Sequence, residues 1–129
     1  MSFECVIDSF AWMEYLRGGR LGERVREYVE RGNGATPSLV IGELSAKFHR
    51  DGLEGWPKAR DFILSHSAIL GLDWSVADKA GETLKALRVR RRNAGLADAI
   101  MLETARSLEV PLLTGDEDLR GAAGVLFLE

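Results

Sequence analysis

The sequence predicts an α/β fold in which helices cover a parallel sheet. Short apolar runs alternate with longer segments whose apolar residues recur at helical spacing, and this is the order that βα units produce. The length of 129 residues is enough for one domain with its own core, so we expect a single domain over residues 1–129. An apolar fraction of 46% and a charged fraction of 29% are typical of a soluble globular protein, which needs no disulfides to fold.

The N-terminal quarter is expected to form a strand and two helices. Phe3 to Ile7 is mostly apolar and has the length of a strand. Ser9 can cap the helix that follows, and the glycine pair that begins at Gly18 ends that helix. A second helix is expected over residues 21–30, where two valines four residues apart lie on one face.

The middle of the chain is expected to contain two strands separated by two helices. A turn precedes a very short strand at residues 35–36. Pro37 fits the first turn of a helix that runs to Phe48, because a proline there loses no helical hydrogen bond. Another helix should follow Pro57 and lead to a strand at residues 68–72.

The C-terminal part is expected to add two helices and the last two strands. Ser75 is predicted to cap a long helix over residues 76–91. A further helix is expected at residues 96–108, followed by a strand at 110–113 that enters a polar turn. Residues 125–128 are apolar and complete the sheet as its last strand.

Composition also narrows the setting of the protein. The single cysteine, Cys5, excludes a disulfide framework within the chain and suits a reducing compartment. No apolar stretch approaches the roughly 18 residues that span a bilayer, and the N-terminus lacks the features of a signal peptide. We therefore expect a cytoplasmic protein without a membrane partner. The net charge of −3 does not exclude a polyanionic partner, because the acidic residues are expected to gather in one site.

Four acidic residues carry most of the functional information. Asp8 follows the first strand and Asp116 follows the strand at 110–113, so both should lie at the carboxyl edge of the sheet, where open α/β folds bind ligands. Glu43 and Asp98 lie on helices, beside apolar residues. Carboxylates gathered in one place repel each other unless a cation neutralises them. The pattern therefore indicates a divalent metal and, with it, phosphate chemistry.

Each of these acids also has a purely structural interpretation. Asp8 and Asp116 could cap the helices that follow them. Glu43 could pair with Lys47 one turn later, and Asp98 could complement the dipole at the start of its helix. Two further acids follow Asp116 directly, which is more negative charge than capping requires.

Taken in this order, four segments resemble the PIN domain, and most closely the VapC-type toxins of toxin–antitoxin pairs. The segments are VIDSFAWMEYL, PSLVIGEL, LADAIMLETA and LLTGDEDL. No single segment is specific, but the ordered set covers essentially the whole chain. The resemblance implies a three-layer α/β/α sandwich around a central parallel sheet.

The resemblance also implies a site, an activity and partners. The activity would be hydrolysis of RNA phosphodiester bonds by a metal-activated water, with Mg²⁺ as the cofactor and Mn²⁺ as a plausible substitute. The implied partners are an RNA substrate, a small antitoxin protein and a second copy of the chain in a homodimer. The implied catalytic and metal-binding residues are Asp8, Glu43, Asp98 and Asp116, with Ser9, Thr114 and Asp118 in supporting roles.

The densest run of basic residues lies shortly before Asp98. Positive charge at a helix C-terminus is favourable by itself, and the same run could guide an RNA backbone toward the acids. Both interpretations stay open for these arginines, which are Arg88, Arg90, Arg91 and Arg92.

Three other functions compete with the toxin. A housekeeping RNA-processing nuclease would use the same chemistry without an antitoxin, and a non-cleaving module would bind RNA or protein with the same pocket. A phospho-acceptor receiver domain also places an acid after its first strand. It needs a lysine near the end of the sheet, and the chain has none from Val125 onward, which disfavours this third alternative.

Overall fold

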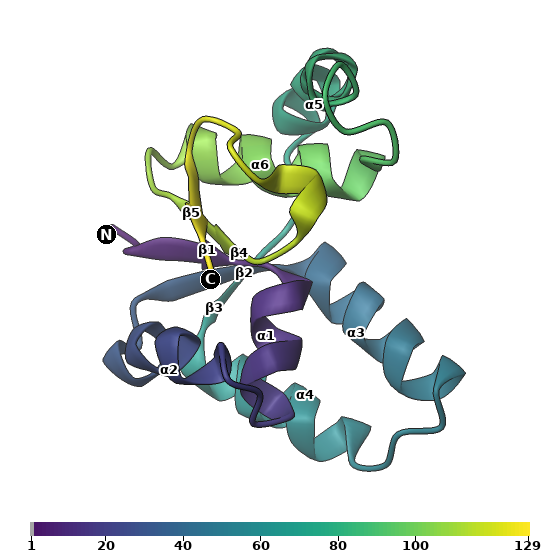
Figure 1. Ribbon diagram of the computed structural model, residues 1–129. Coiled ribbons are helices and arrows are strands. Elements are labelled where there is room, and N and C mark those ends of the chain that lie inside the picture. Colours follow the sequence, from purple (N-terminus) through teal and green to yellow (C-terminus); the bar gives the residue numbers. More distant parts are fainter. Residues whose placement is uncertain (1) are drawn as a thin grey trace.

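The computed structural model describes residues 2–129, which form a five-stranded parallel sheet between two layers of helices (Figure 1). Every neighbouring pair of strands is parallel, and the order across the sheet is β3-β2-β1-β4-β5. This arrangement confirms the predicted α/β/α sandwich with a central parallel sheet. The strands are β1 (Cys5–Ile7), β2 (Gly34–Pro37), β3 (Ala68–Leu70), β4 (Leu112–Thr114) and β5 (Val125–Phe127).

The helices divide between the two faces according to their place in the chain (Figure 1). The first four cover one face, whereas α6 packs on β1 and β4 from the other face and α5 packs on α6. Within residues 2–129, no helix combines the length and apolar character needed to cross a bilayer. The helices are α1 (Ser9–Leu16), α2 (Gly22–Arg31), α3 (Ser38–Arg50), α4 (Trp56–His66), α5 (Trp74–Leu87) and α6 (Leu96–Ser107), with a short 3₁₀ turn, η1 (Glu117–Leu119).

The two central strands form the middle of the hydrophobic core. Val6 on β1 pairs with Leu112 on β4, and both side chains are fully buried because helices cover each face of the sheet. Trp12 on α1 is also fully buried, and its indole N–H donates to the Thr36 hydroxyl at 2.9 Å. The direction of winding reverses at β1, since β2 lies on one side of it and β4 on the other. The carboxyl edge between β1 and β4 is therefore the expected place for a ligand.

Two predicted helix caps are wrong. Asp8 caps α1 instead of Ser9, because its backbone is extended (φ −88°, ψ 179°) and its carboxylate accepts the N–H of Ala11. Likewise, Asp73 precedes α5, and Ser75 lies inside the helix and donates its hydroxyl hydrogen bond to the Asp73 carboxylate. In both cases an aspartate one or two residues before the serine is the N-cap residue.

Several element boundaries differ from the prediction by one to four residues, and two of these differences lie near the acids. α5 ends at Leu87 rather than at residue 91, because the backbone N–H groups of Arg90 and Arg91 both bond to the Leu87 carbonyl and close a turn. The arginine run therefore lies in a loop. β4 is shifted to Leu112–Thr114, so Thr114 belongs to the sheet and pairs with β5.

Candidate metal centre

Asp8 follows β1 and is only 2% exposed. Its Oδ1 accepts the Ala11 N–H at 2.9 Å, which fixes the carboxylate at the start of α1. Burial raises the pKa of Asp8 to about 7; the Thr114 hydroxyl and the Ala11 N–H oppose this rise, and the charges of Asp116 and Asp98 add to it. With this pKa the Asp8 carboxyl is only partly ionised at neutral pH, and a cation bound nearby would favour its ionised form.

Three further carboxylates form a compact cluster. Asp98, Asp116 and Asp118 each contribute an oxygen that lies within 4.8 Å of the other two. Asp98 is in the first turn of α6, where its Oδ2 accepts the Gly95 N–H at 2.9 Å. Burial raises the pKa of Asp98 to about 6, against the effect of this N–H, and the charges of Asp116, Asp118 and Glu43 raise it further.

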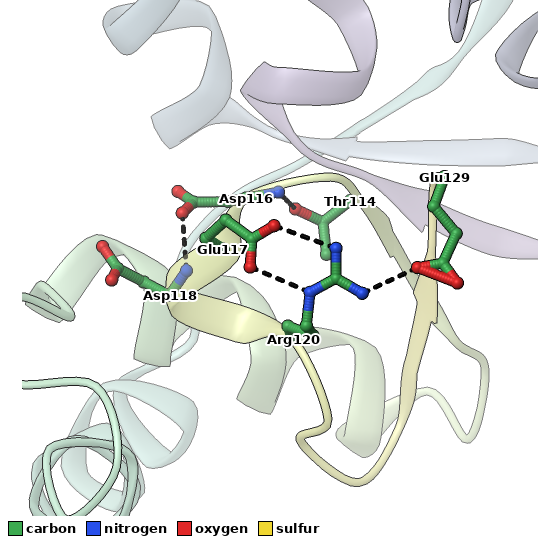
Figure 2. Close-up of polar contacts among 6 residues, drawn as sticks. All are labelled: Thr114, Asp116, Glu117, Asp118, Arg120 and Glu129. Atoms are coloured by element: carbon green, nitrogen blue, oxygen red, sulfur yellow. Dashed lines mark hydrogen bonds and ion pairs between the residues drawn. The ribbon is translucent and has the colours of Figure 1, made fainter.

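The turn after β4 holds two of these acids, Asp116 and Asp118, next to each other (Figure 2). The Thr114 hydroxyl accepts the Asp116 N–H at 3.0 Å, and Asp116 Oδ1 accepts the Asp118 N–H at 2.9 Å. Gly115 lies between Thr114 and Asp116, and a Cβ atom at this position would come within 2.3 Å of the Phe10 ring. A glycine is therefore needed for this turn to approach α1 closely. Gly115 was not among the residues that the sequence singled out, although a glycine between a strand and an acid is a usable signal.

The third acid of this turn has a different role. Figure 2 shows Glu117 paired with Arg120, at 2.8 and 2.9 Å, while the same guanidinium reaches Glu129 at 2.7 Å. Glu117 is thus neutralised by a local ion pair. Of the three consecutive acids, Asp116 and Asp118 face the cluster.

Glu43 borders the cluster without belonging to the group of three. Its Oε1 accepts the Ser9 hydroxyl at 2.7 Å, which joins α3 to α1. The alternative helix pair with Lys47 is absent from the described part of the chain, because Lys47 pairs with Asp51 at 3.5 Å. The charge of Glu43 nevertheless contributes to the raised pKa of Asp98, so the two carboxylates share one electrostatic environment.

A groove of about 360 Å³ leads away from the acids between α1 and α3. Ser9, Glu43 and Asp116 line it, together with the basic residues Arg17, Lys47 and Arg50. Acidic and basic side chains thus line one continuous groove. Such an arrangement can bind a polyanion along the groove while a cation binds one of its phosphates at the acids.

The chemistry of the side chains fits a hard divalent cation. All ligands in the cluster are carboxylate oxygens, which Mg²⁺ and Mn²⁺ prefer. The group of three contains neither the histidine nitrogen nor the cysteine sulfur ligands that zinc sites commonly use. The pKa values of Asp8 and Asp98 are raised mainly by burial and further by neighbouring carboxylates, and a bound divalent cation would favour the ionised form of both.

The structure places the predicted acids in one region but gives them unequal positions. Asp98, Asp116 and the supporting residue Asp118 form the compact group. Asp8 is buried and interacts electrostatically with Asp98 and Asp116, and Glu43 interacts in the same way with Asp98. The predicted supporting hydroxyls also contact acids: Ser9 donates to Glu43, and Thr114 accepts from the backbone of Asp116. Two of the groove's basic residues, Lys47 and Arg50, were not predicted from the sequence to contact RNA, and Lys47 served only as a possible partner of Glu43.

Comparison with known proteins agrees with this fold. Among curated proteins, none matches the chain significantly. Solved structures that share its fold include a toxin–antitoxin complex from Klebsiella pneumoniae, with 22% identity, 95% of each chain covered and a TM-score of 0.68. PAE2754 from Pyrobaculum aerophilum has 20% identity over 98% of this chain and 92% of that one, with a TM-score of 0.68. VapBC2 from Rickettsia felis, bound to a DNA fragment from its promoter, has 16% identity over 98% of this chain and 97% of that one, with a TM-score of 0.70. The family model of the PIN domain matches residues 5–125. The protein therefore belongs to the PIN domain family.

Proposed function

We propose that this protein is a metal-dependent endoribonuclease and the toxin of a VapBC-like type II toxin–antitoxin module. The observation that carries the proposal is the cluster of Asp98, Asp116 and Asp118, with oxygens within 4.8 Å of one another at the carboxyl edge of a PIN-type sheet. Buried Asp8 and the half-buried Glu43 complete the acidic site. Membership of the PIN family supports nuclease chemistry, and the proposal assigns this activity to residues 1–129 as one domain.

The proposed partners follow from the same comparisons. Two of the similar structures are toxin–antitoxin assemblies, which supports a small antitoxin protein as the regulator of this chain. The remaining proposals are an RNA substrate, a homodimer and a cytoplasmic location. The basic residues of the groove, Arg17, Lys47 and Arg50, support a polyanionic substrate.

The proposed mechanism assigns each residue a position around the scissile phosphate. Asp8, Asp98, Asp116 and Glu43, supported by Asp118, would hold Mg²⁺ or Mn²⁺. When bound, the cation supplies charge stabilisation for the phosphate oxygens and lowers the pKa of a nearby water. The protein itself needs no nucleophilic side chain for this chemistry.

The hydrogen bonds of the site keep the acids in place for this role. Backbone N–H groups orient Asp98 and Asp116, and the Ser9 hydroxyl binds Oε1 of Glu43, which leaves its Oε2 for a proton or a ligand. Attack of water on phosphorus forms one P–O bond and breaks the P–O3′ bond. The water's protons pass to a carboxylate and to the leaving 3′ oxygen, so the products carry a 5′-phosphate and a 3′-hydroxyl.

The decisive experiment is cleavage of a labelled RNA panel by the purified protein with Mg²⁺, Mn²⁺ or EDTA. Asp8→Asn is the inactive variant, and Asp61→Asn, an exposed aspartate paired with Arg60 on α4, is the matched control. We expect metal-dependent cuts from the wild type and the control, and none from Asp8→Asn. Equal cutting by all three proteins would show a contaminating nuclease and contradict the proposal.

The toxin role is tested separately from the nuclease. The protein is co-expressed with the product of a small open reading frame next to its own gene. A toxin requires that this product bind tightly and suppress RNA cleavage. A nuclease that cuts equally well in its presence would instead be a housekeeping RNA-processing enzyme.

A further inference from the structure

A second cavity, of about 370 Å³, lies between the end of α5, α6 and the loop that follows η1. We call it the arginine pocket, after the four arginines among its lining residues. Its other walls are largely apolar and include Ala86, Leu87 and Ala122, and Asp118 of the acidic cluster also lines it. The volume is within the range of roughly 300–1,000 Å³ that is typical of small-ligand sites.

Two of the four arginines are already neutralised. Arg106 donates to Glu103 at 3.0 Å, and Arg120 is paired with both Glu117 and Glu129. These ion pairs fix the walls of the pocket and leave little charge for a ligand. The positive charge that a ligand can use comes from the other two arginines, which belong to the loop after α5.

Arg90 and Arg91 are these two residues. The Nε of Arg91 is buried and has no hydrogen-bond partner among residues 2–129, which is rare for a buried donor and points to a missing acceptor. By contrast, Arg88 uses its Nε to bond the Ala94 carbonyl at 2.9 Å and does not line the pocket, and neither does Arg92. The pocket thus separates two arginines of the basic run from the other two.

We propose that the arginine pocket binds one nucleotide of the RNA substrate, next to the scissile phosphodiester. The inference rests on the proposed nuclease function. Asp118 lines the pocket and is within 4.8 Å of Asp98 and Asp116, so a nucleotide in the pocket can be joined directly to a phosphate at the cluster. Apolar walls suit a base, and the guanidinium groups of Arg90 and Arg91 suit its phosphate.

The charge and position favour a nucleotide over a peptide. An apolar peptide would fill the walls but would leave the positive charges of Arg90 and Arg91 without a counter-charge. An acidic peptide would satisfy the arginines, but it has no reason to lie beside a carboxylate such as Asp118. A nucleotide fits both the basic and the acidic side of the pocket. Its own phosphate binds the arginines, and the neighbouring phosphate binds the cation at the acids.

The test measures binding of a fluorescein-labelled, mixed-sequence single-stranded RNA 12-mer by anisotropy. All proteins carry Asp8→Asn and are assayed with Mg²⁺, so the RNA is not cut. The double variant Arg90→Gln/Arg91→Gln should raise the Kd at least about tenfold. It should also reduce the steepness of log K against log salt by roughly 0.7 for each phosphate that the protein no longer binds. Arg26→Gln on α2, which covers the opposite face of the sheet, should change neither quantity.

A second pair of variants tests the pocket itself. Ala86 is exposed at the pocket wall, so substitutions there should leave the fold intact, which a melting curve checks. Ala86→Glu brings a negative charge to the arginines and should weaken RNA binding more than Ala86→Gln, which has nearly the same size. Equal effects of the two variants would mean that the arginines do not bind phosphate.

The outcomes separate this inference from the proposed function. Unchanged Kd and salt slope in the double arginine variant would overturn the nucleotide pocket, even if the wild type cleaves RNA. Loss of RNA binding in that variant, with no cleavage by the wild type, would support the pocket and overturn the nuclease. Loss of antitoxin binding with unchanged RNA binding would show a peptide site and overturn the inference.

Discussion

The carboxylate of Asp8 is buried at the end of β1, with the negative charges of Asp98 and Asp116 nearby. As the cap of α1 it stabilises the helix, and such a cap contributes about 0.5–2 kcal/mol. Its ionised form, however, is poorly solvated, which is why its pKa rises to about 7. Asp8 therefore stabilises the fold through its helix-capping hydrogen bond and destabilises the metal-free protein through its buried charge.

This conflict predicts the effect of Asp8→Asn. The amide oxygen can still accept the Ala11 N–H, so the cap remains, while the buried charge is removed. In EDTA at pH 8 we expect the variant to be more stable than the wild type by on the order of 1–3 kcal/mol. Millimolar Mg²⁺ should raise the melting temperature of the wild type by more than that of the variant, which keeps the cluster of Asp98, Asp116 and Asp118.

Scanning calorimetry of both proteins, with and without Mg²⁺, measures these effects. Asp61→Asn is the control for replacing an exposed, ion-paired aspartate, and it should keep the response to Mg²⁺. A variant that is less stable than the wild type in EDTA would mean that the charge of Asp8 is stabilised by the protein alone.

Single residues also show where sequence reasoning ends. The position of Asp8 at a strand end was predictable from the apolar run before it, but both Asp8 and Ser9 are good caps, and only the backbone geometry decides between them. The partner of Glu43 was not predictable, because Lys47 is one turn away whereas Ser9 is 34 positions distant in sequence. Contacts between distant segments depend on how the helices pack.

At the scale of elements, a buried glutamate fixes the helix that carries Asp98. Glu103 on α6 is 4% exposed and accepts the Thr83 hydroxyl of α5 at 2.6 Å and the Arg106 guanidinium at 3.0 Å. Arg106 in turn donates to the Ala123 carbonyl, in the loop before β5. This network joins α5, α6 and that loop on one side of the sheet.

Breaking the network should destabilise the fold. Glu103→Ala leaves the Thr83 hydroxyl and the Arg106 guanidinium without their acceptor, and we expect a loss of roughly 2–4 kcal/mol in the free energy of unfolding. Urea denaturation measures the loss, with Glu82→Ala on the exposed part of α5 as the control. A loss no larger than that of the control would show that the network contributes nothing to stability.

The elements themselves were largely predictable, whereas their ends were not. The spacing of apolar residues predicts each helix and strand because each must bury one face. The end of α5 was misplaced because arginines are good helix formers and extend the helical pattern past Leu87, where the chain in fact turns. Because of this error, the sequence did not predict the loop in which Arg90 and Arg91 line the arginine pocket.

For the whole molecule, groups with opposite pKa shifts give stability a maximum in pH. Burial alone would raise the pKa of Glu103, but its contacts with Thr83 and Arg106 lower the pKa overall. Glu103 therefore stabilises the folded state above about pH 4.5, and this stabilisation is lost as the pH falls below that value. Asp8 and Asp98 have raised pKa values of about 7 and 6, so they bind more protons in the folded state. Their effect is to lower stability as the pH rises from about 4 to 7.

The melting temperature of the metal-free protein should therefore fall between pH 5 and pH 8, and excess Mg²⁺ should reverse this trend. A cation binds the ionised carboxylates, so raising the pH removes the competing protons and strengthens binding to the folded state. Melting curves across this range, with EDTA or with Mg²⁺, test the prediction, and the Asp8→Asn/Asp98→Asn double variant should show a flatter profile in both. If wild-type curves with EDTA and with Mg²⁺ ran parallel, the acidic cluster would not be a metal site, because only a bound cation couples these carboxylates to the pH in the opposite direction.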